Sequence, residues 1–333
     1  MAPLRWGIAS AGKISNDFCA ALSTYSQDDH QVVAVAARSL EDAKEFAETF
    51  NIPRTHEGYQ KLAQDPEVDV VYIGSINTTH LEIGLMMLDG GKHILCEKPL
   101  TLNVKQAEQL LNHAKEKKLF CMEAIWSRYF PIYRQLKARI NNGDLGDIKE
   151  VYAEFGVEMA DVDRVMKNEL GGGSTLDIGT YAIQFSQFVF RAEPTSIKAT
   201  GKLNEEGVDT ETEVELKYPN GGVARYKTNS TKELSNIATV TGSKGTMKLH
   251  TFWCPTELED VDGQMKKFEL PQNRLGKFIY FHGAGMRYEA EEVRRCINEG
   301  LTESEDATHN DSLVIARIRD EIRRQLGVKF DED

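Results

Sequence analysis

The first third of the chain alternates short apolar runs with longer amphipathic segments. Five apolar runs bounded by turn residues predict buried strands at residues 4–9, 31–37, 69–74, 93–96 and 119–122. Apolar positions at helical spacing predict helices between them, at residues 13–25, 40–50, 79–90 and 104–114. This alternation is typical of a parallel sheet covered on both faces, so we expect an α/β Rossmann-type doubly wound domain.

The pattern changes after residue 123. Alternating apolar and polar positions predict strands at residues 148–157, 195–203, 210–218, 222–230, 236–241 and 245–251. Helical spacing returns at residues 285–299 and 311–326. We therefore expect a dinucleotide-binding domain over residues 1–123. An α+β domain with a large, mainly antiparallel open sheet is expected over 124–333, for substrate binding and dimerisation.

Composition narrows the class of protein. The 333 residues carry a net charge of −12, which argues against a general binder of nucleic acid or of anionic membranes. No apolar run approaches the roughly 18 residues of a membrane span, and the predicted first strand begins too early to leave room for a signal peptide. The five cysteines are scattered without metal-ligand spacing, so we expect reduced thiols, no metal site and a cytoplasmic location.

The turn after the first predicted strand reads Ser10-Ala11-Gly12-Lys13-Ile14-Ser15. A dinucleotide-binding fingerprint belongs at this place, and only its middle glycine is kept. Gly12 would let the backbone approach a pyrophosphate at the helix N-terminus, with Ser10 and Ile14 beside it. The competing interpretation is an ordinary strand-to-helix turn.

The second strand ends at Ala37-Arg38-Ser39, where an NAD site usually carries a carboxylate. A guanidinium at this place pairs with a 2′-phosphate, so Arg38 and Ser39 predict NADP as the cofactor. The alternative is an exposed arginine at the start of a helix.

Two further segments offer chemistry. Glu97-Lys98-Pro99 follows the fourth strand of the first domain, at the edge of the sheet where ligands bind. The later run from Gly171 to Tyr181 supplies a carboxylate, Asp177, and the Tyr181 phenol. A lysine near a tyrosine lowers the phenol pKa, which suits proton exchange with a hydroxyl that is being oxidised. Taken alone, Lys98 would be interpreted as a surface residue.

These motifs, with Leu4-Arg5-Trp6-Gly7, Trp253-Cys254-Pro255 and Gly283-Ala284-Gly285, resemble the glucose–fructose oxidoreductase, inositol dehydrogenase and rhizopine-catabolism (Gfo/Idh/MocA) superfamily. The resemblance is closest to its branch of NADP-dependent dimeric dihydrodiol dehydrogenases, which also act as D-xylose 1-dehydrogenases. Many members carry histidine where this chain has Tyr181, and the dihydrodiol dehydrogenase branch carries tyrosine. The resemblance covers nearly the whole chain.

The resemblance implies roles for individual residues. Tyr181 would be the acid/base, Lys98 a cofactor contact that perturbs its pKa, and Asp177 an acceptor for the substrate hydroxyl. The cofactor would also contact Tyr72, His80 and Glu97, although His80 is equally explained as the start of a helix. The expected walls of the substrate pocket, each otherwise ordinary core, are Trp126, Arg128, Phe155 and Tyr280.

The sequence therefore predicts an NADP-dependent dehydrogenase with its active site in a cleft. Its substrates would be trans-dihydrodiols, aldopentoses such as D-xylose, or both. We also expect a homodimer formed through the C-terminal sheet. The alternatives are a hexose or polyol dehydrogenase of the same superfamily, and a regulator that senses nucleotides without catalysis.

Overall fold

The computed structural model describes residues 2–333, which form two compact units. The first comprises Met1–Thr101, Lys105–Trp126 and Leu270–His309. The second comprises Leu102–Val104, Ser127–Glu269 and Asn310–Asp333. The segment Leu270–His309 thus groups with the nucleotide-binding fold, whereas the sequence pattern assigned it to the second domain. The reason is local packing: helix α9 (Met286–Asn298) lies against helix α1 (Lys13–Leu22) of the first unit.

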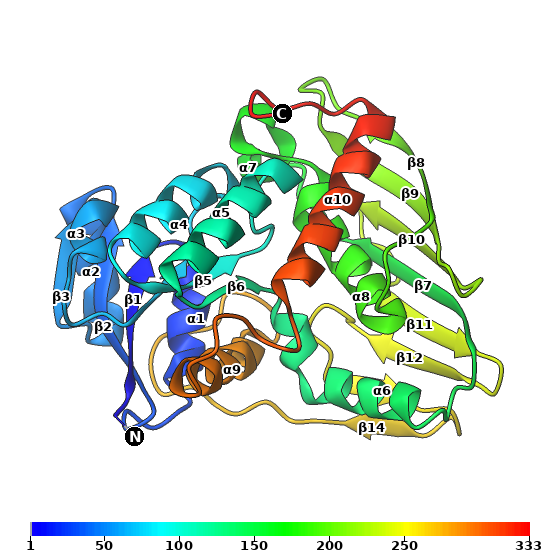
Figure 1. The fold of residues 1–333 in the computed structure, drawn as a ribbon, viewed down its shortest axis with the longest axis horizontal. Helices are drawn as coiled ribbons and strands as arrows, with labels where there is room; N and C mark the ends of the chain where they lie inside the picture. The colour runs from blue at the N-terminus through cyan, green and yellow to red at the C-terminus, as the bar shows by residue number, and fades with distance from the viewer. Residues whose placement is uncertain (1) are drawn as a thin grey trace. The chain divides into compact units, whose positions relative to one another are not determined.

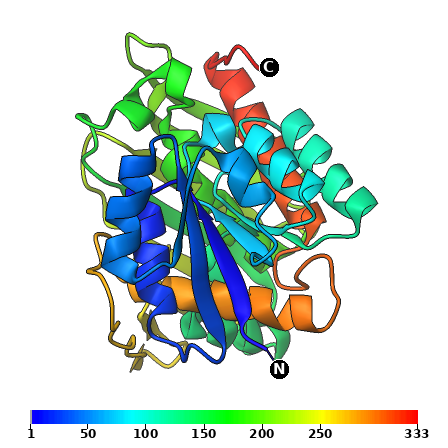
Figure 2. The same ribbon diagram turned by 90° about the vertical axis from the view of Figure 1, so that its left-hand side faces the viewer.

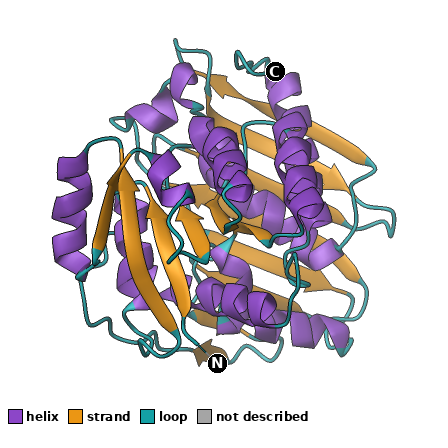
Figure 3. Cartoon of the chain, turned by 60° about the vertical axis from the view of Figure 1, so that its left-hand side comes forward, coloured by secondary structure: helices purple, strands orange, loops and turns teal. Residues whose placement is uncertain are grey.

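The first unit contains a six-stranded sheet in the order β3-β2-β1-β4-β5-β6, with every pairing parallel. The strands are β1 (Leu4–Ala9), β2 (His30–Ala37), β3 (Arg54–Glu57), β4 (Val70–Ile73), β5 (His93–Glu97) and β6 (Cys121–Ala124). Figure 3 shows these strands side by side with helices on both faces. The predicted Rossmann-type architecture is confirmed.

The helices of this unit are α1, α2 (Leu40–Phe50), α3 (Tyr59–Ala63), α4 (His80–Asp89), α5 (Val104–Lys117) and α9, with short 3-10 turns η1 (Asn77–Thr79) and η5 (Gly283–Gly285). Strand β3 and helix α3 were not predicted, because four and five residues are too few to show a period. Figure 2 shows α9, in orange, near the blue helix α1. Asp17 of α1 binds the loop that leads to α9, since its carboxylate accepts from the backbone N–H groups of Ile279 and Tyr280 at 2.8 Å each.

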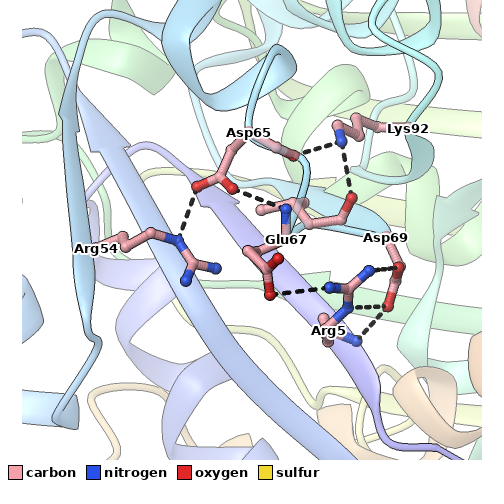
Figure 4. A network of polar contacts seen from close by, with 7 residues as sticks. Arg5, Arg54, Asp65, Glu67, Asp69 and Lys92 are labelled. Atoms are coloured by element: carbon pink, nitrogen blue, oxygen red, sulfur yellow. Dashed lines mark hydrogen bonds and ion pairs between the residues drawn. The ribbon is translucent and has the colours of Figure 1, made fainter.

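Charged side chains hold together the edge of this sheet where the strands begin (Figure 4). Arg5 of β1 donates from Nη2 to Oδ1 of Asp69 at 2.6 Å and from Nε to Oδ2 at 2.9 Å. The buried ammonium of Lys92 donates to the backbone oxygens of Asp65 and Val68. These contacts join the starts of β1, β4 and β5, so they stabilise strand register at the edge opposite the carboxyl ends.

The second unit contains an eight-stranded sheet in the order β14-β13-β12-β11-β7-β10-β9-β8. Its strands are β7 (Ile148–Gly156), β8 (Ser196–Leu203), β9 (Asp209–Lys217), β10 (Val223–Asn229), β11 (Ile237–Gly242), β12 (Thr246–His250), β13 (Glu257–Glu259) and β14 (Met265–Lys267). All pairings are antiparallel except β7 with β10. The predicted mainly antiparallel sheet is confirmed, and the three-residue strands β13 and β14 were missed.

The helical elements of the second unit are η2 (Trp126–Tyr129), α6 (Pro131–Asn141), α7 (Asp163–Met166), η3 (Asn168–Leu170), a π-helical turn η4 (Thr175–Gly179), α8 (Thr180–Phe190) and α10 (His309–Leu326). Helices α6, α8 and α10 lie on one face of the sheet (Figure 1). Residues 180–189 are all buried, so α8 has no polar stripe, and no helix was predicted there.

Exposed charged side chains lie on one face of strands β7, β9 and β10. Arg225 pairs with Glu150 at 2.6 Å and with Glu215 at 2.8 Å, and Lys227 pairs with Glu213 at 2.7 Å.

Across residues 2–333, no helix is long and apolar enough to cross a membrane. All five cysteines are buried, and none of them forms a disulfide.

Candidate active site

The segments predicted to bind the cofactor follow parallel strands of the first unit. Ser10 follows β1, Arg38 follows β2, Ser75 follows β4 and Lys98 follows β5. Because the strands are parallel, these four residues lie at the same edge of the sheet. Strands β1 and β4 are neighbours whose helical connections run in opposite directions, and a crevice at that position binds nucleotides in doubly wound folds.

The turn after β1 fits a pyrophosphate. Gly12 is the N-cap of α1 and has no side chain to cap the helix N–H groups. A Cβ atom at Gly74 would overlap the Ser15 hydroxyl, so glycine lets the end of β4 approach the start of α1. The buried Ser15 Oγ has no hydrogen-bond partner among the described residues. An unpartnered hydroxyl and uncapped N–H groups at one turn are donors suited to a phosphate oxygen.

The end of β2 carries an exposed cation. The Arg38 side chain is exposed, and no described carboxylate forms an ion pair with it. Tyr59 lies beside Arg38. Burial raises the pKa of Tyr59, although a hydrogen bond with Ser10 and the charge of Arg38 oppose this shift. Ser39 caps α2, because its Oγ accepts from the backbone N–H of Asp42 at 3.1 Å. The exposed guanidinium of Arg38 is a group that could pair with a 2′-phosphate.

Tyr72 lies in the core of the first unit, where its ring stacks on Phe18 at 3.9 Å. Its hydroxyl donates to Oε1 of Glu97 at 2.6 Å, and Oε2 of Glu97 accepts from the backbone N–H of Lys98 at 3.2 Å. Burial and the neighbouring Glu97 raise the Tyr72 pKa, so the phenol stays protonated and acts as a donor. Tyr72 therefore orients the segment that carries Lys98.

His80, predicted as a cofactor contact, is the first residue of α4 and is buried. Its Nδ1 lies 2.9 Å from the carbonyl oxygen of Pro99, and its Nε2 lies 3.0 Å from that of Ser75. Burial lowers the His80 pKa. The ring thus lies between the loop after β4 and the segment after β5, and its single N–H can donate to one of the two carbonyl oxygens. The buried Glu123 fixes the segment after β5 by accepting from the N–H of Leu100 at 2.9 Å.

Asp177 and Tyr181 belong to the second unit. They lie four residues apart, on η4 and the first turn of α8, so both project from one side of a continuous helical segment. Tyr181 is 8% exposed, and its ring lies 5.7 Å from that of Phe155. Phe155 in turn stacks on Trp253 at 3.9 Å. The predicted pocket residue Phe155 therefore packs beside the predicted acid/base within this unit.

Arg128 is 3% exposed and belongs to a hydrogen-bond network with residues of α8 and α10. Its guanidinium donates to Asp311 at 3.0 Å and to Gln187 at 2.7 Å, and Gln187 donates to Asp311 at 2.6 Å. These contacts hold α8 against α10. The other two predicted pocket walls lie in the first unit, where Trp126 is buried and the Tyr280 side chain is 38% exposed.

Four polar residues at these segments were not identified from the sequence. Asp209 accepts from the N–H and hydroxyl of Thr175, at 2.7 and 2.8 Å, and so fixes the start of η4. The others are Asp17, Glu289 and Arg164. Asp17 and Glu289 are charged residues buried on helices. To identify them from the sequence, one would have to know which face of each helix is buried.

Among residues 2–333 there is no group of three or more His, Cys, Asp or Glu side chains that would hold a metal ion.

The chain is similar over its full length to proteins of known name. Trans-1,2-dihydrobenzene-1,2-diol dehydrogenase of Danio rerio is 45% identical over 332 residues, with 99% of each chain covered. The Homo sapiens protein of the same name is 42% identical over 333 residues, again with 99% of each covered. Residues 4–125 match the oxidoreductase family with an NAD-binding Rossmann fold, and residues 133–248 match the GFO/IDH/MocA C-terminal domain.

The chain belongs to the Gfo/Idh/MocA oxidoreductase family. Solved structures of family-like fold agree with this assignment. A 3-ketoreductase from Actinomadura kijaniata, in complex with NADP and TDP-benzene, is 25% identical, covers 97% of this chain and 98% of its own, and superposes with a TM-score of 0.81. An aldose-aldose oxidoreductase from Caulobacter crescentus has a TM-score of 0.84 at 20% identity, with 98% of each chain covered, and shows a shared fold alone.

Proposed function

We propose that this chain is an NADP-dependent dehydrogenase that oxidises a hydroxyl group of trans-dihydrodiols, of aldopentoses such as D-xylose, or of both. The observation that carries the proposal is the 45% identity over 99% of the chain to a trans-1,2-dihydrobenzene-1,2-diol dehydrogenase. At the positions that matter for the chemistry, the chain has Lys98, Asp177 and Tyr181.

The preference for NADP over NAD rests on Arg38. An exposed guanidinium at the end of β2, without a carboxylate partner, favours a cofactor with a 2′-phosphate. Ser10 and Gly12 would hold the pyrophosphate, with Ser15 as an additional donor. The related 3-ketoreductase was solved with NADP, which agrees with this preference.

Three side chains take part in the proposed chemistry. Tyr181 takes the proton of the substrate hydroxyl, and the positive charge of Lys98 stabilises the phenolate that this requires. Asp177 accepts a hydrogen bond from a neighbouring hydroxyl of the substrate and so orients the carbon that is oxidised. The bound nicotinamide supplies the acceptor for the hydride. A dihydrodiol would give a product that tautomerises to a catechol, and an aldopentose would give a lactone.

We further propose a homodimer formed through the outward face of the second unit's sheet, located in the cytoplasm. The charged side chains on strands β7, β9 and β10 mean that such an interface would be polar rather than apolar. Buried cysteines without disulfides suit a reducing compartment.

A substrate panel tests the proposal. Purified protein is assayed for nicotinamide reduction with NADP and with NAD, against trans-dihydrodiols, pentoses, hexoses and inositol-like polyols. We expect the highest kcat/KM with NADP and either a dihydrodiol or a pentose. A higher kcat/KM for hexoses or polyols would assign the substrate class differently, and cofactor binding without turnover of any member would favour a nucleotide sensor.

A further inference from the structure

Asp177 has a partner that the sequence did not predict. Nη1 of Arg164, on the short helix α7, donates to Oδ1 of Asp177 at 2.8 Å. The Asp177 side chain is 11% exposed, and that of Arg164 is 43% exposed. An ion pair with a solvent-exposed guanidinium contributes little to stability, so fold stability gives a weak reason for this contact.

The glycine run before Asp177 brings the two residues together. The backbone N–H of Gly173 donates to the carbonyl of Val165 at 2.8 Å, and that of Gly172 donates to Lys167 at 3.0 Å. A Cβ atom at Gly172 would lie 2.6 Å from the Val165 oxygen, and Gly173 has a φ of 122°. Only glycine fits this approach, so the run allows the backbone of α7 to bond to the backbone ahead of Asp177.

The opposite side of the same segment is fixed by Asp209. Its Oδ2 accepts from both the N–H and the hydroxyl of Thr175, two residues before Asp177. Asp209 is 1% exposed, so this anchor is held within the core of the second unit. With the backbone anchored there, the direction of the Asp177 carboxylate is determined by what binds its oxygens, and Arg164 binds Oδ1.

We propose that Arg164 is a positioning residue for the reaction proposed above: it holds the Asp177 carboxylate in the orientation that accepts the neighbouring hydroxyl of the substrate. The inference rests on the proposed function. It assigns the Gly171–Gly173 run a role as the docking site of α7, and it explains why a cation on a four-residue helix reaches this one carboxylate. A reacting group displaced by about 1 Å loses as much as 10²-fold in rate, so the orientation of Asp177 matters to catalysis.

A double-mutant cycle tests the proposal. The variants are Arg164→Gln, Asp177→Asn and the pair together, with Arg164→Lys as the conservative replacement. Arg317→Gln is the matched control, because Arg317, on α10 of the same unit, is exposed to a similar degree as Arg164 and pairs with Glu193 at 2.7 Å. Thermal melting of each variant confirms that it is folded.

We expect Arg164→Gln to lower kcat/KM for the organic substrate about tenfold while leaving the KM for NADP unchanged. Arg164→Lys should recover part of the loss, and Arg317→Gln should have no effect. In the Asp177→Asn background, Arg164→Gln should change kcat/KM less than about twofold, because its partner is already altered. Multiplicative losses in the pair would overturn the proposal, and so would an Arg164→Gln enzyme with wild-type kinetics.

Failure of the proposed function gives a different result. If wild-type protein binds NADP and turns over no member of the panel, the dehydrogenase assignment fails and the role of Arg164 fails with it. If wild-type protein is active and the cycle shows no coupling, the role of Arg164 alone is refuted.

Discussion

The hydroxyl of Tyr72 and the carboxylate of Glu97 are joined by a buried hydrogen bond of 2.6 Å. Tyr72 lies on β4 and Glu97 on the neighbouring strand β5, so the bond connects two carboxyl ends of the sheet at the proposed nucleotide crevice. The other carboxylate oxygen accepts from the N–H of Lys98. The position of Lys98 therefore depends on a tyrosine that we had expected to contact the cofactor itself.

A second carboxyl group faces this pair and makes stability depend on pH. Glu289 of α9 is fully buried, and neither of its oxygens has a hydrogen-bond partner among the described residues. Burial, with the nearby Glu97, raises the Glu289 pKa well above 4.5. The folded state thus keeps a proton that the unfolded state releases as pH rises above about 4.5, so Glu289 reduces stability at neutral pH.

We expect Glu289→Gln to be more stable than wild type at about pH 8, with a melting temperature raised by roughly 3 °C or more, and to show a smaller gain at about pH 4.5.

Glu292→Gln on the same helix is the matched control. Burial opposes ionisation of Glu292, but hydrogen bonds from Arg295 and Ser304 lower its pKa, so its contribution is present above pH 4.5 and is lost as pH falls. Glu292→Gln should therefore be destabilised at pH 8. Equal shifts for Glu289→Gln at both pH values would show that Glu289 titrates normally.

Cofactor preference is tested at Arg38. Replacing Arg38 with Asp removes the guanidinium and adds a repelling charge, so NADP affinity should fall roughly 10–150-fold, equivalent to about 1.5–3 kcal/mol. NAD lacks the 2′-phosphate and serves as the internal control, because its affinity should hold or improve. Fluorescence titration with both cofactors measures the change. Equal or tighter binding of NAD by the unmutated protein would refute the NADP assignment.

The oligomeric state is tested by light scattering at micromolar protein concentration and moderate salt. We expect a mass of about twice 37.4 kDa. Because Arg225 pairs with Glu150 and Glu215 on the proposed interface, Arg225→Glu should shift the mass toward that of one chain. Arg317→Glu, on α10, should leave the mass unchanged. A wild-type mass of one chain throughout the concentration range would refute the dimer.

The main sheets were predictable because their strands carry a strong pattern. Strand β4 is a continuous apolar run, β1 and β5 are mainly apolar, and β9 alternates between more and less buried positions. The pattern fails at α8, which is buried on all sides, and at β7 and β10, whose parallel pairing joins segments about 70 residues apart. Pairing between distant strands is decided by the packed sheet and leaves no local signal.

The sequence suggested which residues belong to the candidate site, but it did not suggest which contacts those residues make. Glycines and a lysine next to proline stand out as motifs, so Gly12 and Lys98 were identified from the sequence. Arg164 is one of 40 basic residues, and its contact with Asp177 exists only because a glycine run lets α7 dock. Ser39 caps α2, a use of its hydroxyl that the sequence also allows, and its contact with the cofactor stays a prediction.

The most direct measurement of the central claim is steady-state kinetics of Tyr181→Phe beside wild type, with NADP and the best substrate of the panel. Removing the phenol hydroxyl takes away the proton acceptor without touching the cofactor site. We therefore expect kcat to fall about 10²–10⁴-fold while the Kd for NADP stays within about twofold of wild type. A Tyr181→Phe enzyme that keeps more than about a tenth of wild-type kcat would contradict the account and move proton transfer to another group.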